Sequence, residues 1–201
     1  MSARMSGADG PTRIERERRA QIIAAAVSLV AEHGYAAASL ARIADAAGVV
    51  KGTVVYHFTT KDAVLTAAYQ HVLTALVTHV GEHVDASPPP ERPEAYVRAM
   101  IGYLADHPDH ARTMVQAGLA AANNGASRHE RQERWRPLAG LLSEARGDDR
   151  GPGRDERTLA ILAGGMIDAV VDEFLEDPTF DTGSAASEIV EMVGSRLGAD
   201  S

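Results

Sequence analysis

The sequence predicts an all-α protein, and three observations support this prediction. Apolar residues recur at helical spacing along the chain, and no convincing run of the strict alternation typical of a strand is present. Aromatic residues make up only 4% of the chain, which is low for a β protein. Glycine, proline and capping residues divide the periodic segments into lengths that suit helices.

The first predicted helix is defined by its two ends. Thr12 and Glu15 have the spacing of a capping box, which opens the helix. Gly34 ends it, because glycine accepts the left-handed conformation beyond a helix C-terminus. The residues expected to be buried are Ile22, Ile23, Ala26, Val27 and Val30.

Two short helices and one long helix follow. Ser39 caps a short helix over residues 39–46, and Gly48 marks a tight turn. A second short helix covers residues 50–58, and Thr60 caps a longer one over residues 61–84. The three prolines at 88–90 cannot lie inside a helix, so they predict a stiff surface loop. Further helices are expected at 92–106, 108–123, 127–146, 155–176 and 184–197.

Composition limits the class of protein. The chain has 201 residues, of which 45% are hydrophobic, as in an ordinary soluble globular protein. The absence of cysteine excludes disulfides and cysteine-ligated zinc. No uncharged run of about 18 apolar residues and no apolar leader is present, so we expect a cytoplasmic protein with no membrane partner.

The charge is unevenly distributed. Residues 1–61 carry eight basic and five acidic side chains, a net charge of +3, and the rest carries 12 and 23, a net charge of −11. This asymmetry suggests a basic module that faces a polyanion, joined to an acidic body. Chance clustering of arginine on an exposed helix is the alternative.

The helices at 39–46 and 50–57 have the spacing of a helix-turn-helix. The second helix of such a motif presents short or polar side chains to a major groove about 12 Å wide. Lys51, Gly52, Thr53 and Tyr56 meet this requirement. Lysine supplies charge, glycine lets the backbone approach closely, and threonine can bond a phosphate or touch a thymine methyl group.

Here the sequence closely resembles the DNA-binding domain of TetR-family regulators. The resemblance rests on Gly34-Tyr35 and on the runs 39–49 and 52–62, and it is dense over residues 18–66. It implies an N-terminal three-helix DNA-binding domain followed by a helical ligand-binding and dimerisation domain. The implied divisions are a flexible basic arm at 1–17, the helix-turn-helix domain at 18–62, and the effector-binding and dimerisation domain at 63–201.

The resemblance also implies contacts to double-stranded DNA. Tyr56 and His57 match positions that touch phosphates or base edges, and Lys61 matches a lysine that touches a phosphate. The arginine-rich arm resembles arms that some members place in a minor groove. The full candidate set is Ser39, Arg42, Lys51, Gly52, Thr53, Tyr56, His57 and Lys61. Packing of Tyr56 on its own domain is the alternative to a role in the groove.

Two positions depart from the family pattern. Val50 stands where serine is usual, so the second short helix lacks a side-chain cap, which costs about 1 kcal/mol. Val55 stands where tyrosine is more common, so one phosphate contact is missing or moves to Tyr56. Both departures affect the expected DNA contacts, not the fold.

In this family the C-terminal helices bind a small effector and form the dimer. Methionine and aromatic side chains adapt to apolar ligands, and tyrosine and glutamine fix orientation. The candidate pocket residues are Met100, Tyr103, Leu104, Met114, Gln116 and Trp135, with ordinary core packing as the alternative. The last two helices are expected to form a four-helix homodimer interface through Leu159, Leu162, Met166, Val170, Phe174, Ala186, Ile189, Val190 and Val193, beside Gly164 and Gly165.

A histidine pair raises an alternative function. His79 and His83 lie four residues apart on the apolar face of the fourth helix, so both are expected to point inward. With Glu82 they match H-x-x-E-H, in which two imidazoles hold zinc and the glutamate acts as a base. A zinc-dependent hydrolase, a regulatory metal or pH-sensitive site, and purely structural histidines are therefore the alternatives. Spacing marks no third zinc ligand.

Together these features predict a ligand-responsive transcriptional regulator rather than an enzyme. We expect a homodimeric repressor that an unidentified small-molecule effector releases from a palindromic operator at the nucleoid. The expected protein uses no cofactor and no metal.

Overall fold

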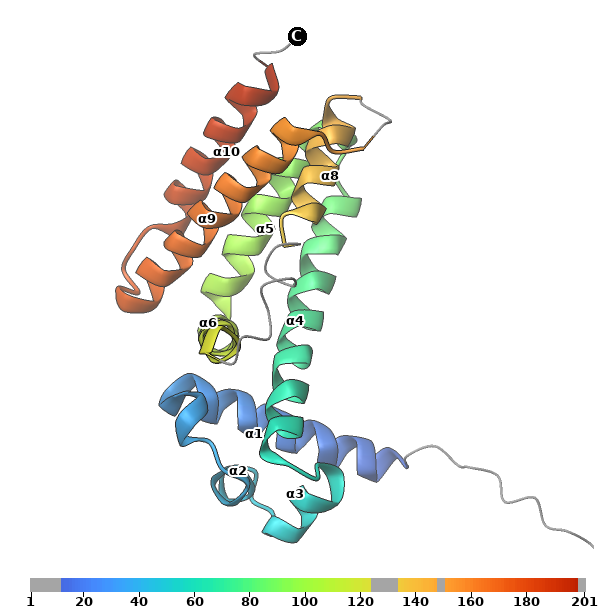
Figure 1. The fold of residues 1–201 in the computed structure, drawn as a ribbon, viewed down its shortest axis with the longest axis vertical. Helices are drawn as coiled ribbons and strands as arrows, with labels where there is room; N and C mark the ends of the chain where they lie inside the picture. Colours follow the sequence, from blue (N-terminus) through green and yellow to red (C-terminus); the bar gives the residue numbers. More distant parts are fainter. Residues whose placement is uncertain (1–11, 124–133, 148–150, 199–201) are drawn as a thin grey trace, which may run out of the picture. The chain divides into compact units, whose positions relative to one another are not determined.

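The computed structural model describes residues 12–123, 134–147 and 151–198. Every regular element in these ranges is a helix, which confirms the predicted all-α fold (Figure 1). Contacts divide the chain into two compact units, Met1–Tyr69 and Gln70–Ser201, here called the N-terminal and C-terminal units.

The N-terminal unit is built on two very short helices. It holds α1 (Arg13–Ala37), α2 (Leu40–Ala46), α3 (Lys51–His57) and the start of α4 (Lys61–Asp85). Seven-residue helices such as α2 and α3 are not stable alone in water, so tertiary packing must hold them. That packing comes from a core that includes Ile22, Val30, Ile43, Val54, Phe58, Val64 and Leu65.

The helix ends follow the caps that the sequence predicts. Thr12 Oγ1 accepts from the Glu15 N–H at 3.2 Å, and Glu15 Oε2 accepts from the Thr12 N–H at 2.7 Å, so the capping box is confirmed. The hydroxyls of Ser39 and Thr60 accept backbone N–H bonds at the starts of α2 and α4, at 3.3 and 3.1 Å. Val50 supplies no side-chain bond to α3, as predicted.

The C-terminal unit contains two apolar clusters. Besides the rest of α4 it holds η1 (Pro89–Glu91), α5 (Arg92–Asp106), α6 (Pro108–Asn123), α8 (Arg136–Ala145), α9 (Arg154–Glu176) and α10 (Thr182–Gly198). The first cluster joins α5, α8, α9 and α10 and includes Val97, Ile101, Leu138, Leu142, Ile167 and Ile189. The second joins α4, α5, α6 and α9 and includes Leu76, Val80, Tyr103, Leu104, Ala111 and Val171. Helix α5 contributes to both clusters.

Some predicted boundaries need correction. The proline segment is not a plain loop, because Pro89–Glu91 forms a single 3-10 turn, whose first residues need no N–H donor. Of the helix expected at 127–146, the described part is α8, and residues 124–133 lie outside the described residues. Gly34 does break α1 as predicted, with a φ of 77°, although helical turns resume after it.

Helices α9 and α10 differ from the predicted interface. Ala186, Ile189 and Val193 are buried within this same chain, so the prediction that they face a second copy is wrong. The core side of α9 consists of Ala160, Ala163, Ile167 and Val171, and most of the predicted stripe lies beside it, half-buried. The large apolar side chains that these two helices leave exposed are Ile161, Leu162 and Met192.

A part-buried ion pair links the end of α8 to the start of α9. Arg146 Nη1 donates to Glu156 Oε1 at 2.5 Å, and these side chains are 21% and 11% exposed. Arg146 Nη2 also donates to the carbonyl of Arg196 at 3.0 Å, and Glu156 Oε2 accepts from the Gly153 N–H at 2.9 Å. One carboxylate therefore both pairs with α8 and caps α9.

By length and composition alone, one helix among the described residues meets the criterion for a membrane span. This is α4, with a mean hydropathy of 1.2 over an 18-residue window. The sequence-based criterion did not identify it because it required an unbroken run of apolar residues, and polar residues interrupt the run in α4. Its buried side chains, including Val64, Val72, Leu76 and Val80, pack against other helices of the protein. Such packing accounts for the buried apolar residues of α4, whereas Val77 on the same helix is 61% exposed.

Candidate nucleic-acid interface

Helix α3 presents one side to the protein and the opposite side to solvent. Val54 and the following Phe58 are 0% and 4% exposed, and Thr53 and His57 are half-buried. At about 100° per residue, the remaining positions share the other side of the helix. All of them are exposed, and we call them the outer face of α3: Lys51, Gly52, Val55 and Tyr56.

No contact or backbone conformation within the protein requires glycine at position 52. Its backbone is helical, and a Cβ atom at this position would meet no atom within 4 Å. Glycine in a helix interior is less favourable than alanine by about 1 kcal/mol. The open space above Gly52 would let another molecule approach the backbone of α3 closely, which is the role that the sequence predicts for this glycine.

Two of the cationic side chains predicted to contact DNA form hydrogen bonds to backbone carbonyls at the end of α1. Arg42 Nη1 donates to the carbonyl of Ala37 at 3.0 Å, and Lys61 Nζ donates to the carbonyl of Ala36 at 3.4 Å. Carbonyl groups at a helix C-terminus carry partial negative charge and attract cations. Together with exposed Ser39, these side chains gather positive charge and a hydroxyl group where α1, α2 and α4 meet.

Tyr56 does not pack into its own domain. The residue is 72% exposed, and its ring meets the His57 ring edge-on at 5.1 Å. Its hydroxyl donates to Glu15 Oε1 at 2.9 Å, and this bond raises the pKa of the Tyr56 hydroxyl. The backbone bond from Thr12, followed by the bond from Tyr56, lowers the pKa of the Glu15 carboxyl. Sequence reasoning found Glu15 only as a capping residue.

Arginine side chains add positive charge along the first turns of α1. Arg16 and Arg18 are exposed, and Arg13 pairs with Glu17 at 2.8 Å. The Arg19 guanidinium lies 4.8 Å from the centre of the Phe58 ring. Most of the predicted basic arm, residues 1–11, lies outside the described residues.

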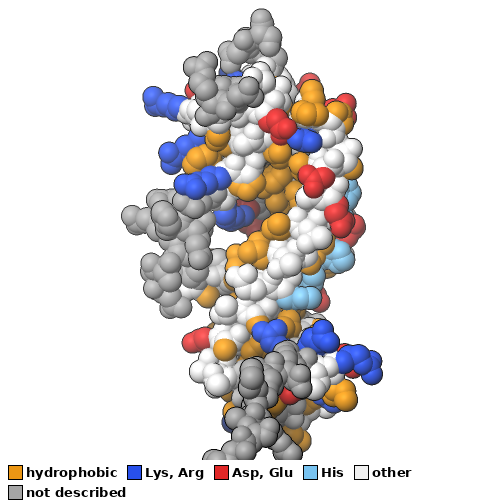
Figure 2. Space-filling view, turned by 90° about the vertical axis from the view of Figure 1, so that its right-hand side faces the viewer, with side chains coloured by type: hydrophobic (Ala, Val, Ile, Leu, Met, Phe, Trp, Pro, Cys, Tyr) orange, Lys and Arg blue, Asp and Glu red, His pale blue; other side chains and the backbone are white. Residues whose placement is uncertain are grey.

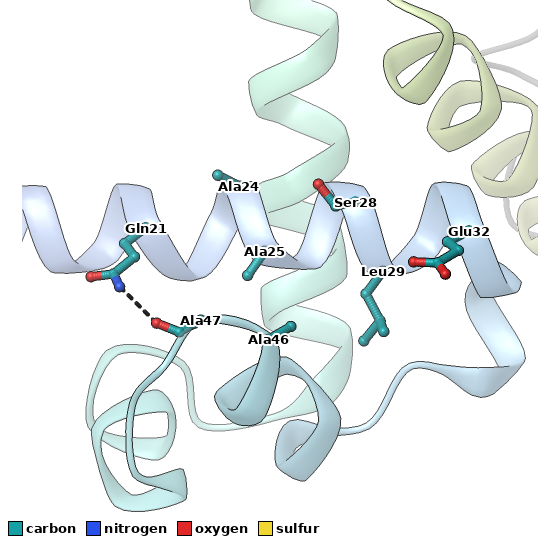
Figure 3. A pocket seen from close by; sticks show the side chains of 8 residues that line it. All are labelled: Gln21, Ala24, Ala25, Ser28, Leu29, Glu32, Ala46 and Ala47. Carbon is teal, nitrogen blue, oxygen red and sulfur yellow. Dashed lines mark hydrogen bonds between the residues drawn. The ribbon is translucent and has the colours of Figure 1, made fainter.

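A hollow of about 310 Å³ lies between α1 and α2 (Figure 3). At one end the Gln21 amide donates to the carbonyl of Ala47 at 2.6 Å, which ties the turn after α2 to α1. The lining consists mostly of small side chains and includes one acidic residue, Glu32. The small side chains let α2 approach α1, and we assign no ligand to this hollow.

The predicted effector residues lie in and around the apolar clusters of the C-terminal unit. Tyr103 and Leu104 belong to the second cluster, and Met100 and Met114 pack against it. Trp135 packs against the first cluster, as Met100 also does, and Gln116 is half-buried on α6. The structure thus brings four of the six predicted residues together.

Five histidines and Tyr103 form a chain of neighbouring rings in the C-terminal unit, and three of the histidines contact Tyr103 itself, namely His79, His107 and His110. The Tyr103 hydroxyl lies 2.8 Å from His110 Nδ1. Burial, followed by charge on His107 and His71, lowers the pKa of His110, and Asp109 acts in the opposite direction. Histidine side chains are visible together on one face in Figure 2. Ring centres of neighbours in the group lie 4.3 to 6.2 Å apart, and its histidines are His71, His79, His83, His107 and His110.

The H-x-x-E-H segment does not form a zinc site in this structure. His83 is exposed, so the prediction that it points inward is wrong, and its Nδ1 lies 2.8 Å from the carbonyl of His79. The half-buried ring of His79 lies against Tyr103. Within residues 12–123, 134–147 and 151–198, no three His, Asp or Glu side chains are placed to hold a metal ion together.

Comparison with known sequences places the N-terminal part in one family. The profile described as "Bacterial regulatory proteins, tetR family" matches residues 22–68. The HTH-type transcriptional regulator BetI of Ectopseudomonas mendocina is 40% identical over 84 residues, so the match spans 42% of each chain. The fatty acid metabolism regulator protein of Bacillus subtilis is 24% identical over 190 residues, 91% of this chain and 97% of that protein.

Comparison with solved structures extends the similarity in fold to both units. A TetR-like transcriptional regulator from Rhodococcus sp. RHA1 has a TM-score of 0.74 at 20% identity, over 94% of this chain and 97% of that one. The regulator FadR from Bacillus subtilis, crystallised with stearoyl-CoA, has a TM-score of 0.71 at 23% identity, over 88% and 97%. At these identities the likeness concerns the fold.

Proposed function

We propose that the chain belongs to the TetR family of bacterial transcriptional regulators and is a homodimeric repressor that a small-molecule effector releases from a palindromic operator. Transcription regulators of this family are not enzymes, so a zinc hydrolase is no longer an alternative. One observation carries the proposal, namely the solvent-facing outer face of α3 on a helix held by buried Val54 and Phe58.

We propose that this outer face enters the major groove. Lys51 at the N-terminus supplies charge for a phosphate or a guanine, and the space above Gly52 permits close approach. Val55 offers an apolar surface to a thymine methyl group, and Tyr56 offers a ring and a hydroxyl. Ser39, Arg42, Thr53, His57 and Lys61 would contact the phosphate backbone around this helix.

A long-chain acyl-CoA is the effector class that we propose to test first. Two relatives favour it: the Bacillus subtilis protein named for fatty acid metabolism and the FadR structure that contains stearoyl-CoA. The apolar candidates Met100, Leu104 and Met114 offer surroundings suited to an acyl chain, while Tyr103 offers a hydroxyl. Gln116 and Trp135 complete the proposed pocket.

We propose that the dimer interface lies on α9 and α10. Ile161, Leu162 and Met192 are 50%, 59% and 47% exposed in the single chain, and large apolar side chains of this kind favour contact with a second copy. A two-fold dimer presents two copies of α3 one or more helical turns of DNA apart, which suits a palindromic operator.

Release requires that the effector prefer a conformation with low affinity for the operator. Helix α4 is the proposed link, because it runs without interruption from Lys61 to Asp85 and has residues in both units. A shift of α4 on effector binding would change the distance between the two copies of α3. The regulator would act in the cytoplasm, at the nucleoid.

The test measures binding of the full chain to its own upstream DNA as a function of salt. Sequence-selective binding with a steep salt dependence supports the proposal, and equal affinity for unrelated DNA contradicts it. Lys51→Ala should weaken binding to all sequences and reduce the salt slope by about 1, whereas Arg154→Ala on α9 serves as the charge-matched control. Added stearoyl-CoA should release the operator, with coenzyme A and stearate alone as separate controls.

A further inference from the structure

Glu15 uses both oxygens of its carboxylate for different contacts. Oε2 accepts from the Thr12 N–H at 2.7 Å and closes the capping box of α1, while Oε1 accepts the Tyr56 hydroxyl at 2.9 Å. A capping box requires only the first of these bonds. The second reaches across 41 residues of sequence to the outer face of α3.

This second bond contributes little to the packing of the core. Tyr56 is 72% exposed, so its ring buries little apolar surface, and the buried residues Val54 and Phe58 already anchor α3. An exposed tyrosine would otherwise sample several rotamers. The bond to Glu15 selects one of them, and because the hydroxyl hydrogen points to the carboxylate, the free lone pair of the hydroxyl remains available as an acceptor.

We propose that Glu15 is a positioning residue for DNA reading, in which the first turn of α1 holds the Tyr56 side chain in the geometry that meets the operator. This inference rests on the proposed function and adds a determinant from outside the helix-turn-helix. A side chain fixed before binding loses less freedom on binding, which corresponds to about a threefold to tenfold gain in affinity.

Electrostatics makes the opposite prediction, which sharpens the test. A carboxylate near DNA repels phosphates, so its removal should tighten binding if charge alone matters. Glu17 provides the matched control, because it is an exposed glutamate on the same part of α1 and contacts Arg13 instead of α3. Positioning predicts weaker operator binding for Glu15→Ala, while charge predicts unchanged or tighter binding for both variants.

The experiment is a double-mutant cycle on the full chain, read by fluorescence anisotropy with an operator duplex selected from its upstream DNA. Glu15→Ala should weaken specific binding about threefold to tenfold, but less than twofold when Tyr56→Phe is already present. Thr12→Ala disturbs the capping box without removing the carboxylate, and it should leave operator affinity within twofold of wild type. Equal losses in both Tyr56 backgrounds, or the same behaviour for Glu15→Ala and Glu17→Ala, would overturn the inference.

A second readout needs no DNA. In the free protein, NMR of ¹³Cζ-labelled tyrosine should show a lower pKa for Tyr56 in Glu15→Ala than in wild type, and an unchanged value in Glu17→Ala. An unchanged Tyr56 pKa in Glu15→Ala would mean that the bond is absent and would overturn the inference independently of the operator. If wild type itself shows no sequence preference, the proposed function fails, and the inference fails with it.

Discussion

Replacing Gly52 with alanine should change the stability of the fold and the affinity for DNA in opposite directions. The added Cβ atom meets nothing within 4 Å, and the backbone at this position is already helical, so no steric penalty is expected. Alanine is favoured over glycine inside helices by about 0.5 to 1 kcal/mol. Because Gly52 lies in the first turn of α3, we expect the lower end, about 0.5 kcal/mol of added stability.

DNA binding should change in the opposite direction. A methyl group on the outer face of α3 would hold the helix away from the groove and weaken its closest base contacts. Loss of contacts of this kind corresponds to about 1 to 3 kcal/mol, or about a 5-fold to 150-fold weaker operator affinity. Urea unfolding gives the stability change, and anisotropy at fixed salt gives the affinity.

Gly118→Ala is the matched control. Gly118 is an exposed glycine within α6, and its Cβ would also meet nothing within 4 Å. This variant should gain up to about 1 kcal/mol, because Gly118 lies in the interior of α6, and it should bind the operator as wild type does. Wild-type operator affinity in Gly52→Ala would refute the close approach, and a destabilised Gly52→Ala would refute the claim that the space is open.

Two further predictions concern the C-terminal unit. Because the pKa of His110 is lowered in the folded chain, the unfolded chain binds the proton more readily, and the free energy of unfolding should fall as the pH drops through 6.5. Urea unfolding at pH 7.5 and 5.5 should show a smaller loss for His110→Gln than for wild type, and equal losses would contradict the prediction. Glu156→Ala removes a part-buried carboxylate that pairs with α8 and caps α9, and it should cost about 2 to 4 kcal/mol by urea unfolding. Glu94→Ala, from an exposed pair with Arg98, should cost less than about 1 kcal/mol, and similar costs for the two would show that burial is unimportant.

The features that sequence predicted well are local. The capping box at Thr12, the break at Gly34 and the bare N-terminus of α3 depend on residues within one helical turn, so spacing alone reveals them. The contact between Tyr56 and Glu15 joins residues 41 apart, and no periodic pattern carries that information. The sequence therefore identified Lys51, Gly52 and Tyr56 on the outer face of α3, but it wrongly placed half-buried Thr53 there instead of Val55. It also gave no sign of the contact between Tyr56 and Glu15.

Errors arose where an apolar stripe was used to predict which partner a side chain faces. Val193 on α10 and His83 on α4 each lie on an apolar stripe, but Val193 is buried within the chain and His83 is exposed. A stripe shows that a helix has an apolar side, and it does not show whether the partner is the same chain, a second copy or solvent. Only the packing of the other helices decides this.

The two sides of α3 place different limits on evolutionary change. Substitutions at Val54 or Phe58 alter the core and are selected against whatever DNA the protein binds. Substitutions at Lys51 or Val55 change the unfolding free energy by no more than about 0.5 kcal/mol, because these side chains are exposed. If the outer face of α3 reads the operator as proposed, two copies of a duplicated gene can diverge in operator preference through a few outward substitutions while both retain the fold.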